Sequence, residues 1–373
     1  MAMSSLKNPK KQDKNQVFEK PILLNKKSNF ELAHLLGSDE AKIRAYGHHK
    51  CPREIIEEAM QTDKEGVLKA IASNYSIDIE QVKKIFIKGS NILGELEKNI
   101  ANPECQKKII NESLKMIREC ENNIKIVGLA ENLFNGAIVS GGYLAHLIGK
   151  EIGSDIQFSD IDFYFHDRTL LENTINKILI NSEFDEEIIL DSENNELFLK
   201  NVETYKKGKL KNSNYNVICT KNAITLTENN LPSATYQFIL KSHNAPDTIV
   251  SWFDFSHTKN YILLKNQHFS FDPESVASIK EKKLIFKGGI NPISSFFRMN
   301  KFVKRGWRIS HLEVIKMVAN LQKKVDFNKS ESFIKYLEGF YFHYTYPDLM
   351  KNKMTKIQNI DELLDLLEKE SYF

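Results

Sequence analysis

Residues 136–144 (GAIVSGGYL) and residues 159–165 (SDIDFYF) form the most informative pattern in this sequence of 373 residues. In the second stretch every other residue from position 161 is Ile or Phe. A strand sends alternate side chains to opposite faces, so Asp160 and Asp162 are expected to project together while the apolar residues enter the core. Repulsion between two close carboxylates would raise the pKa of one of them, unless a divalent cation bridges both. Because carboxylate oxygens suit Mg²⁺, the stretch predicts a magnesium site.

The first stretch predicts a strand, a tight turn and a helix. Residues 137–139 are a short apolar run, residues 143–148 continue as a helical run, and Ser140, Gly141 and Gly142 lie between them. Since glycine has no Cβ, a triphosphate can approach the backbone, and the amides at a helix N-terminus attract its negative charge. We therefore expect these three residues to bind the phosphates of a nucleotide beside the two carboxylates.

The order of strand, Gly-Gly, helix and then Asp-x-Asp on the next strand resembles the nucleotidyltransferases of the DNA polymerase beta superfamily. Residues 141–144 (GGYL) look most like the head domain of tRNA CCA-adding and poly(A) polymerases. The resemblance covers the middle of the chain and implies an α+β core with a mixed sheet. A tight turn and a solvated edge strand form the alternative interpretation. That alternative does not explain two acids on one face of a strand whose other face is apolar.

The resemblance also implies a third carboxylate on a later strand, for which Asp254 is the candidate. It lies within residues 248–256 (TIVSWFDFS), where an acid among aromatic residues is costly to bury unless it is paired or bound to metal. A buried hydrogen-bonding acid, or an acid at the end of a helix-like segment at 246–253, is the alternative. On the resemblance, Asp160, Asp162 and Asp254 are catalytic residues that hold Mg²⁺ or Mn²⁺.

A basic helix is expected after residue 290, with Asn291-Pro292 as its start signal and Gly306 as its stop signal. Positive charges recur along it at spacings that gather them on one side: Arg298, Lys301, Arg305 and Arg308. Such a helix can hold an incoming triphosphate or an RNA backbone, and we assign nucleotide binding to Arg298 and Lys301. A solvated basic face is the alternative. Secondary candidates are His166 and Lys259 for phosphate contact and His257 for polar positioning.

Composition and periodicity divide the chain into four regions. They are a disordered basic tail at 1–28, a helical domain at 29–123, the nucleotidyltransferase-like core at 124–290 and a C-terminal helical region at 291–373. The fold class is therefore α+β, a mixed-sheet nucleotidyltransferase core flanked by helical regions. In the helical domain, Asp78 and Gln81 form a capping box, and Asn102-Pro103 starts another helix.

Finer elements are expected in the last two regions. Strands are predicted at 124–127, 215–219 and 236–240, a helix at 170–180, and a solvated hairpin or insertion at 185–201. Two further helices are predicted at 312–322 and 360–368.

Composition excludes several other classes of protein. A net charge of +3 gives no sign of a nucleic-acid partner by itself, so any basic surface must be local. The four cysteines lack CxxC spacing, which fits reduced thiols in a cytoplasmic protein better than disulfides or a zinc site. The N-terminal tail has no apolar signal core, and we expect neither secretion nor a membrane partner.

Together these features predict a metal-dependent transferase that moves a nucleoside monophosphate from an NTP such as ATP to a hydroxyl acceptor. Where CCA-adding enzymes carry Arg-Asp after the glycines, this chain has Ala145-His146. That difference argues against CCA addition itself and leaves the acceptor open among tRNA or other RNA ends, a protein hydroxyl and a small molecule. The alternative is a catalytically silent protein of the same fold that binds nucleotide, RNA or another protein.

Overall fold

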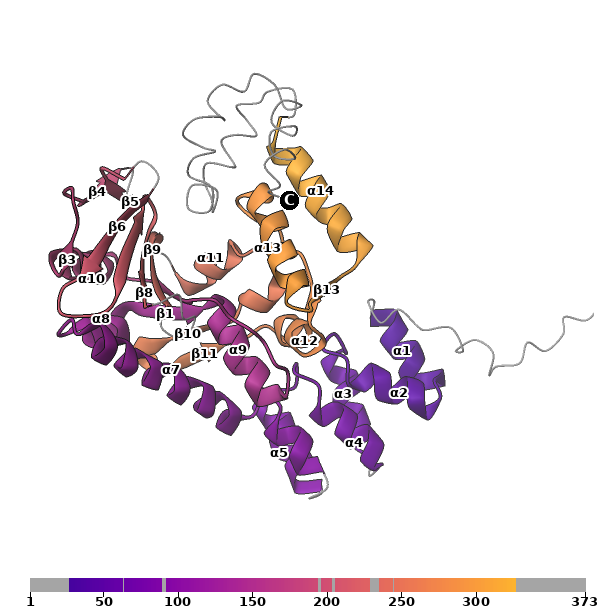
Figure 1. Cartoon of the computed structure of the whole chain (residues 1–373). Helices are drawn as coiled ribbons and strands as arrows, with labels where there is room; N and C mark the ends of the chain where they lie inside the picture. The colour runs from indigo at the N-terminus through magenta and orange to yellow at the C-terminus, as the bar shows by residue number, and fades with distance from the viewer. Residues whose placement is uncertain are drawn as a thin grey trace, which may run out of the picture. The chain divides into compact units, whose positions relative to one another are not determined.

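The computed structural model describes residues 27–62, 64–88, 92–193, 196–202, 205–228, 235–243 and 245–326. The chain divides into two compact units, Met1–Cys105 and Gln106–Phe373. This division is coarser than the four predicted regions, and the predicted boundary near residue 124 falls inside the second unit. Both motif stretches belong to the second unit, many of whose elements are labelled in Figure 1.

The first unit is helical in its described part. Its helices are α1 (Lys27–Leu36), α2 (Asp39–Tyr46), α3 (Arg53–Ala59), α4 (Glu65–Ala72), α5 (Ile79–Lys88) and α6 (Leu93–Glu97). The predicted capping box is confirmed at the start of α5. The Gln81 amide donates to Asp78 Oδ1 at 2.8 Å, and the Asp78 amide donates to Gln81 Oε1 at 3.0 Å.

Two helices lead into the sheet of the second unit, α7 (Pro103–Ile124) and α8 (Leu129–Gly136). The predicted start of α7 is confirmed, because Asn102 Oδ1 accepts from the Glu104 amide at 3.0 Å. The predicted strand at 124–127 is wrong. Ile124 is fully buried and completes α7, and the chain then turns through Lys125 at a φ of 55°. The apolar face of the helix therefore continues into the residues that looked like a strand.

The described residues of the second unit contain a mixed sheet of nine strands in the order β11-β10-β1-β2-β9-β8-β7-β6-β3. The strands are β1 (Ala137–Ser140), β2 (Ile161–Phe165), β3 (Ser182–Glu183), β6 (Tyr205–Leu210), β7 (Asn216–Thr220), β8 (Ala223–Thr227), β9 (Thr235–His243), β10 (Tyr261–Leu263) and β11 (His268–Ser270). β2 and β9 are parallel, and β1 runs antiparallel to both β2 and β10. The predicted α+β class with a mixed sheet is confirmed.

Other predicted elements of this unit are also present. β7 and β9 match the strands expected at 215–219 and 236–240, and α10 (Arg168–Ile180) matches the expected helix. β4 (Ile189–Glu193) and β5 (Glu196–Lys200) pair with each other as an antiparallel hairpin, as predicted for 185–201.

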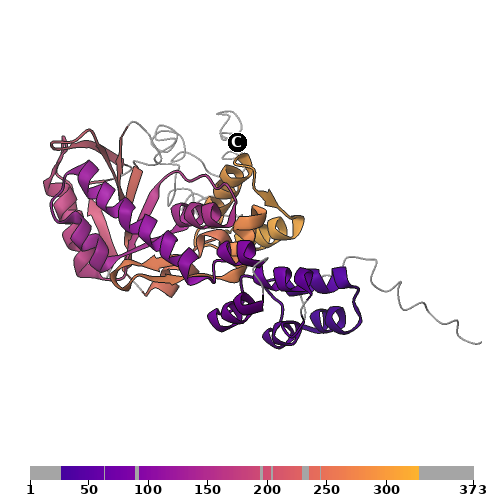
Figure 2. The same ribbon diagram turned by 90° about the horizontal axis from the view of Figure 1, so that it is seen from below.

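The two faces of the sheet have different partners. Ile161, Phe163 and Phe165 point into a buried face, and α7 lies across this face, where Asn123 Nδ2 donates to the Tyr236 hydroxyl at 3.4 Å (Figures 1 and 2). On the opposite face, Tyr164 joins an apolar cluster with residues of α11 (Pro246–Ser251). Asp162 shares this second face because it is two residues from Tyr164 on the same strand.

The chain after β9, apart from the sheet strands β10 and β11, includes α11, which packs on that second face. Its elements are α11, η4 (Ser256–Thr258), η5 (Leu264–Asn266), α12 (Pro273–Glu281), β12 (Lys283–Leu284), α13 (Pro292–Lys304), β13 (Arg308–Ile309) and α14 (His311–Lys324). The predicted start of α13 is confirmed, since Asn291 Oδ1 accepts from the Ser294 amide at 3.0 Å. α14, which lies beside α13 in Figure 1, matches the helix expected at 312–322.

Two further findings concern the predicted C-terminal helix and the helices as possible membrane spans. The helix predicted at 360–368 lies outside the described residues. Within the described part of the chain, no helix has both the length and the apolar character that crossing a membrane would require.

Candidate functional site

The turn between β1 and α9 (Gly141–Ile152) adjoins the carboxylate of Asp162. Ser140 ends the strand and is the N-cap of the helix, so the predicted order of strand, glycine turn and helix is confirmed. Gly141 has a φ of 76°, a conformation that favours glycine. A Cβ at Gly141 would lie 3.2 Å from Asp162 Oδ2. The glycine thus keeps open the space between the helix N-terminus and the carboxylate.

Ser140 contributes to this turn through its backbone. Its side chain is fully buried, and the hydroxyl lies 3.1 Å from the Thr258 carbonyl oxygen and 2.6 Å from that of Asn260. The hydroxyl therefore ties β1 to the segment before β10. Phosphate binding by this residue, as by Gly141 and Gly142, stays a prediction that concerns the backbone amides.

The two aspartates of the second stretch interact electrostatically, as predicted. Asp160 precedes β2 and Asp162 lies within it, and both side chains are half-buried. Burial raises the pKa of Asp162 well above its ordinary value, the charge of Asp160 raises it further, and the positive charges of Lys301 and Arg298 partly offset these effects. In the absence of a cation, the folded state therefore favours the protonated form of Asp162.

The C-terminal half of α13 contacts the loop that carries Asp160. Lys301 Nζ donates to Ser159 Oγ at 2.8 Å, and Ser159 Oγ donates to Asp160 Oδ1 at 2.7 Å. Arg305 Nη1 donates to the Gln157 carbonyl oxygen at 3.4 Å. Burial lowers the pKa of Lys301, the charge of Asp160 partly offsets this effect, and the charge of the nearby Arg305 lowers the pKa further. An additional anion would stabilise this partly desolvated ammonium group.

Asp254 lies beside the same helix, but the prediction that it lies on a strand is wrong. Residues 246–251 form α11, which Pro246 and Asp247 start, and Asp254 follows in a bend before η4. Its Oδ2 accepts from Arg298 Nη1 at 2.7 Å. The side chain of Asp254 is 6% exposed and that of Arg298 is 41% exposed. The structure thus gives Asp254 the character of a buried acid in an ion pair.

The charges of several predicted site residues affect the pKa of one tyrosine, Tyr164. The pKa of Tyr164 is raised by burial and by the charges of Asp162, Asp160 and Asp254, while Arg298 acts in the opposite direction. Three carboxylates from two separate segments and the Arg298 guanidinium of α13 therefore lie within electrostatic reach of one tyrosine. These charged residues, together with Lys301 beside Ser159, form the group of predicted residues that the structure brings together.

Four other candidates lie apart from this group. Arg308 is on β13, where its Nη2 donates to the Glu281 carbonyl oxygen, so it does not join the other bases of the predicted helix. His166 Nδ1 contacts the Gly136 carbonyl oxygen at 2.9 Å, and Lys259 Nζ donates to that of Ser251 at 3.2 Å. His257 is fully buried among aromatic rings, and burial lowers its pKa to about 3.

Sequence reasoning missed two residues that shape the site. Ser159 connects Lys301 to Asp160, and its place directly before the first aspartate was the available signal. Gly289 lies against Asp254, because a Cβ at this glycine would be 3.1 Å from Asp254 Cβ. The pair Gly288-Gly289 just before the start signal of α13 was the corresponding signal.

The residues present fit a magnesium ion held by two carboxylates. Mg²⁺ is usually bound through one or two carboxylates together with substrate phosphates and water. Asp160 and Asp162 would supply the two carboxylates, and Gly141 leaves room next to Asp162 Oδ2. In the described ranges, no group of three or more His, Cys, Asp or Glu side chains gathers closely enough to hold a metal ion. The assignment of Asp254 as a third ligand stays a prediction.

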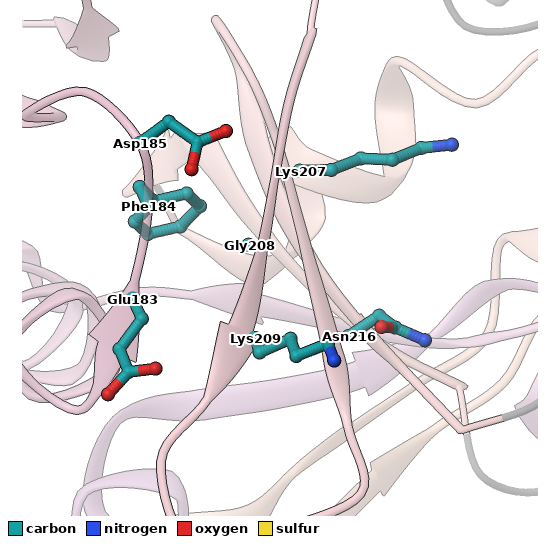
Figure 3. Close-up of a pocket in the computed structure, with 7 residues that line it drawn as sticks. All are labelled: Glu183, Phe184, Asp185, Lys207, Gly208, Lys209 and Asn216. Carbon is teal, nitrogen blue, oxygen red and sulfur yellow. The ribbon is translucent and has the colours of Figure 1, made fainter.

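A shallow pocket of about 390 Å³ lies elsewhere, at the β3–β6–β7 end of the sheet (Figure 3). Glu183, Phe184 and Asp185 line one side, and Lys207, Gly208, Lys209 and Asn216 line the other. Several strands separate this pocket from β1 and β2. None of the predicted site residues lines it, so we do not assign it to the same site.

Comparisons with known proteins give the chain a family match and distant likeness to solved structures. The model of the Gabija anti-defense 2 family protein, Gad2, matches residues 104–282, just under half of the chain. That range includes the glycine turn and all three aspartates. Among solved structures, the chain is similar to the Thermotoga maritima CCA-adding enzyme complexed with tRNA, at 11% sequence identity and a TM-score of 0.34. Such a distant likeness assigns no activity.

The structural match covers 68% of this chain and 53% of the other, so this chain spans about half the length of that enzyme. The search among curated proteins gave no match.

The raised pKa of Asp162 predicts how stability changes with pH. Because the folded state raises this pKa above the ordinary value of 3.8, the folded state retains a proton that the unfolded state has lost. In metal-free buffer, the contribution of Asp162 to the free energy of unfolding should be complete below pH 3.8 and should be lost as the pH rises through its folded pKa. Denaturant titrations of wild type and Asp162→Asn across pH should show a flatter profile for the variant. Identical profiles would contradict the assignment.

Proposed function

We propose that this protein is a metal-dependent nucleotidyltransferase that transfers a nucleoside monophosphate from an NTP to a hydroxyl acceptor. The observation that carries the proposal is the close approach of the α9 N-terminus to Asp162, with 3.2 Å between the Cβ position of Gly141 and Asp162 Oδ2. A phosphate group at that helix N-terminus would lie beside a carboxylate pair suited to Mg²⁺. The triphosphate and the ion could therefore share one site, which is what phosphoryl and nucleotidyl transfer require.

Each residue group has a role in this proposal. Asp160 and Asp162 would hold Mg²⁺ or Mn²⁺, which when bound polarises the reacting phosphate and stabilises the leaving oxygen. The amides of Gly141 and Gly142 would orient the β- and γ-phosphates. Arg298 and Lys301 would contact phosphate oxygens from the side of α13. Burial lowers the pKa of Lys301, so an anion beside it would stabilise the charged form of its ammonium group.

The transfer itself needs no nucleophilic side chain from the protein. The acceptor hydroxyl would lose its proton to solvent, and its oxygen would form a bond to the α-phosphorus. The bond between the α-phosphorus and the oxygen that bridges to the β-phosphorus would break, and pyrophosphate would leave. The residues of the site would hold the reactants in line and offset the negative charge that develops.

The description of the matching family suggests the biological setting. The family is named for Gabija anti-defense, and we extend that role to this chain. The acceptor would then be a component that Gabija defense needs, either a protein hydroxyl or an RNA end such as that of tRNA. Cells with Gabija should lose defense when they express the wild type and keep it when they express Asp162→Asn. Defense that persists with the wild type would contradict the setting and leave the chemistry open to its own test.

A second candidate function is nucleotide binding without turnover. The ion pair between Asp254 and Arg298 favours it, because a guanidinium lies against the carboxylate that a third metal ligand would offer. The two candidates differ in one measurable respect. Both give nucleotide binding, but label moves from the α-phosphate to an acceptor only if the site turns over.

Ligand binding should raise thermal stability if the site is assigned correctly. A ligand at one hundred times its Kd stabilises the native state by about 2.7 kcal/mol, which shifts the melting temperature by several degrees. We expect this shift with Mg²⁺ plus at least one of the four NTPs, and we expect its loss in the variant that carries both Asp160→Asn and Asp162→Asn. Asp155→Asn is the matched control, because Asp155 is an exposed acid of the same loop. A melting temperature that does not change with any of the four NTPs would contradict nucleotide binding.

A further inference from the structure

Asp254 is fixed in place by its backbone and by its surroundings. The whole residue is 4% exposed, and its backbone carbonyl oxygen accepts a hydrogen bond from the Lys287 amide at 2.7 Å. Gly289 approaches its Cβ so closely that a methyl group there would lie 3.1 Å away. The carboxylate therefore has a defined position in the bend between α11 and η4, on the flank of the sheet and not on a strand.

The ion pair of this carboxylate is asymmetric. Asp254 Oδ2 accepts from Arg298 Nη1 at 2.7 Å, with the acid buried and the arginine side chain 41% exposed. A buried carboxylate is stable when it is paired, and removal of its partner leaves an uncompensated charge. A divalent ion on the same carboxylate would be repelled by the guanidinium and would compete with it. Asp254 is therefore suited to hold the Arg298 guanidinium at the edge of the site.

The strand next to Asp162 supplies no acid in place of Asp254. β9 is parallel to β2, and the residue in register with Asp162 is Gln237. Gln237 Nε2 donates to Thr225 Oγ1 at 3.0 Å, so its amide is held toward β8. In the described part of the chain, β9 thus brings no further carboxylate beside Asp162.

Resting on the proposed function, we infer that Asp254 is a positioning residue for Arg298, which binds the β,γ-phosphates, and that Asp254 is not a ligand of the metal. In this arrangement two carboxylates bind the ion, and Arg298, held by its ion pair with Asp254, binds the departing pyrophosphate. The class of ligand at Arg298 is a polyphosphate anion. Its simplest member is inorganic pyrophosphate, the product that the proposed transfer releases.

Two probes separate metal binding from anion binding. Titrations with Mn²⁺ alone, followed by electron paramagnetic resonance, report the ion site, and titrations with inorganic pyrophosphate in EDTA, followed by calorimetry, report the anion site. The variants are Asp162→Asn, Asp254→Asn, Arg298→Gln and the double variant Asp254→Asn/Arg298→Gln. Asn keeps the size of Asp254, and circular dichroism and melting curves show whether each variant folds.

We expect Asp254→Asn to keep Mn²⁺ affinity within about threefold of wild type, since no ligand of the ion changes, whereas Asp162→Asn should lose at least tenfold, roughly the loss expected for one charged contact. Pyrophosphate affinity should fall about tenfold in Asp254→Asn and in Arg298→Gln, again the size of one charge-assisted hydrogen bond. The double variant should bind pyrophosphate no more weakly than the weaker single variant, because residues that act through one contact are not additive.

Three results would overturn the inference. A loss of Mn²⁺ affinity in Asp254→Asn equal to that in Asp162→Asn would make Asp254 a metal ligand. Additive losses of pyrophosphate affinity in the double variant would mean that Asp254 does not act through Arg298. If Asp254→Asn does not fold, the Arg298→Gln variant is the test of the inference. Unchanged pyrophosphate affinity in Arg298→Gln, or weakened Mn²⁺ affinity, would then contradict it. A wild type that binds neither probe would instead contradict the proposed function, and the inference with it.

Discussion

Asp162→Asn should reduce transfer of label from an α-labelled NTP by at least about a thousandfold, because metal coordination contributes several kcal/mol to the stability of such a transition state. The substitution removes a carboxylate whose pKa is raised by burial and by the neighbouring charge of Asp160. A neutral amide of nearly the same size avoids that cost. The variant should therefore be at least as stable as wild type in metal-free buffer, and loss of activity should not follow from loss of fold.

Asp155→Asn is the matched control for this result, since Asp155 is an exposed acid in the same loop as Asp160. The control should transfer label at the wild-type rate. Activity assays and denaturant titrations on the same protein samples separate the effect on chemistry from the effect on stability. Persistent labelling by a folded Asp162→Asn variant would mean that the carboxylates have been assigned the wrong role.

Gly141→Ala should lower the free energy of unfolding by about 1–2 kcal/mol, the cost of a left-handed conformation for a residue with a Cβ. Its effect on transfer should be larger, because the new Cβ would lie 3.2 Å from Asp162 Oδ2 and would displace the carboxylate or the helix N-terminus. Since a misplacement of about 1 Å can cost a hundredfold in rate, we expect a loss of about that size. Denaturant titration and the labelling assay measure the two effects.

Gly153→Ala separates backbone strain from the close approach. Gly153 also has a φ of 76° and ends the same helix, but no atom lies within 4 Å of its Cβ position. The two variants should lose similar stability, and only Gly141→Ala should lose transfer activity. Equal activity in both would show that the space between Gly141 and Asp162 has no part in the reaction.

The parts of the site that sequence could predict are local. The glycine turn, the alternation of β2 and the caps at Asp78 and Asn291 each depend on residues within a few positions of one another. Hydrophobic periodicity also located α10 and α14, because each carries an apolar pattern over several turns. For these elements the local preference and the tertiary structure agree, which is why their positions could be predicted.

The parts that sequence could not predict depend on long-range contacts or on short ambiguous runs. Residues 248–253 (TIVSWF) suit a buried strand as well as a helix, and Pro246 was the signal that favoured the helix. The ion pair between Asp254 and Arg298 joins residues 44 positions apart, and Lys301 reaches Ser159 across 142 positions. No periodicity encodes such pairs, since the fold brings them together.

The proposed chemistry can be tested with wild-type protein, Mg²⁺, each of the four α-labelled NTPs in turn, and either cellular RNA or lysate with Gabija components. The measurement is the amount of label that becomes attached to RNA, to protein or to a small molecule. We expect label from at least one NTP in one acceptor class, with pyrophosphate released in equal amount. Binding of an NTP without label in any class would contradict nucleotidyl transfer and would support the silent binding protein.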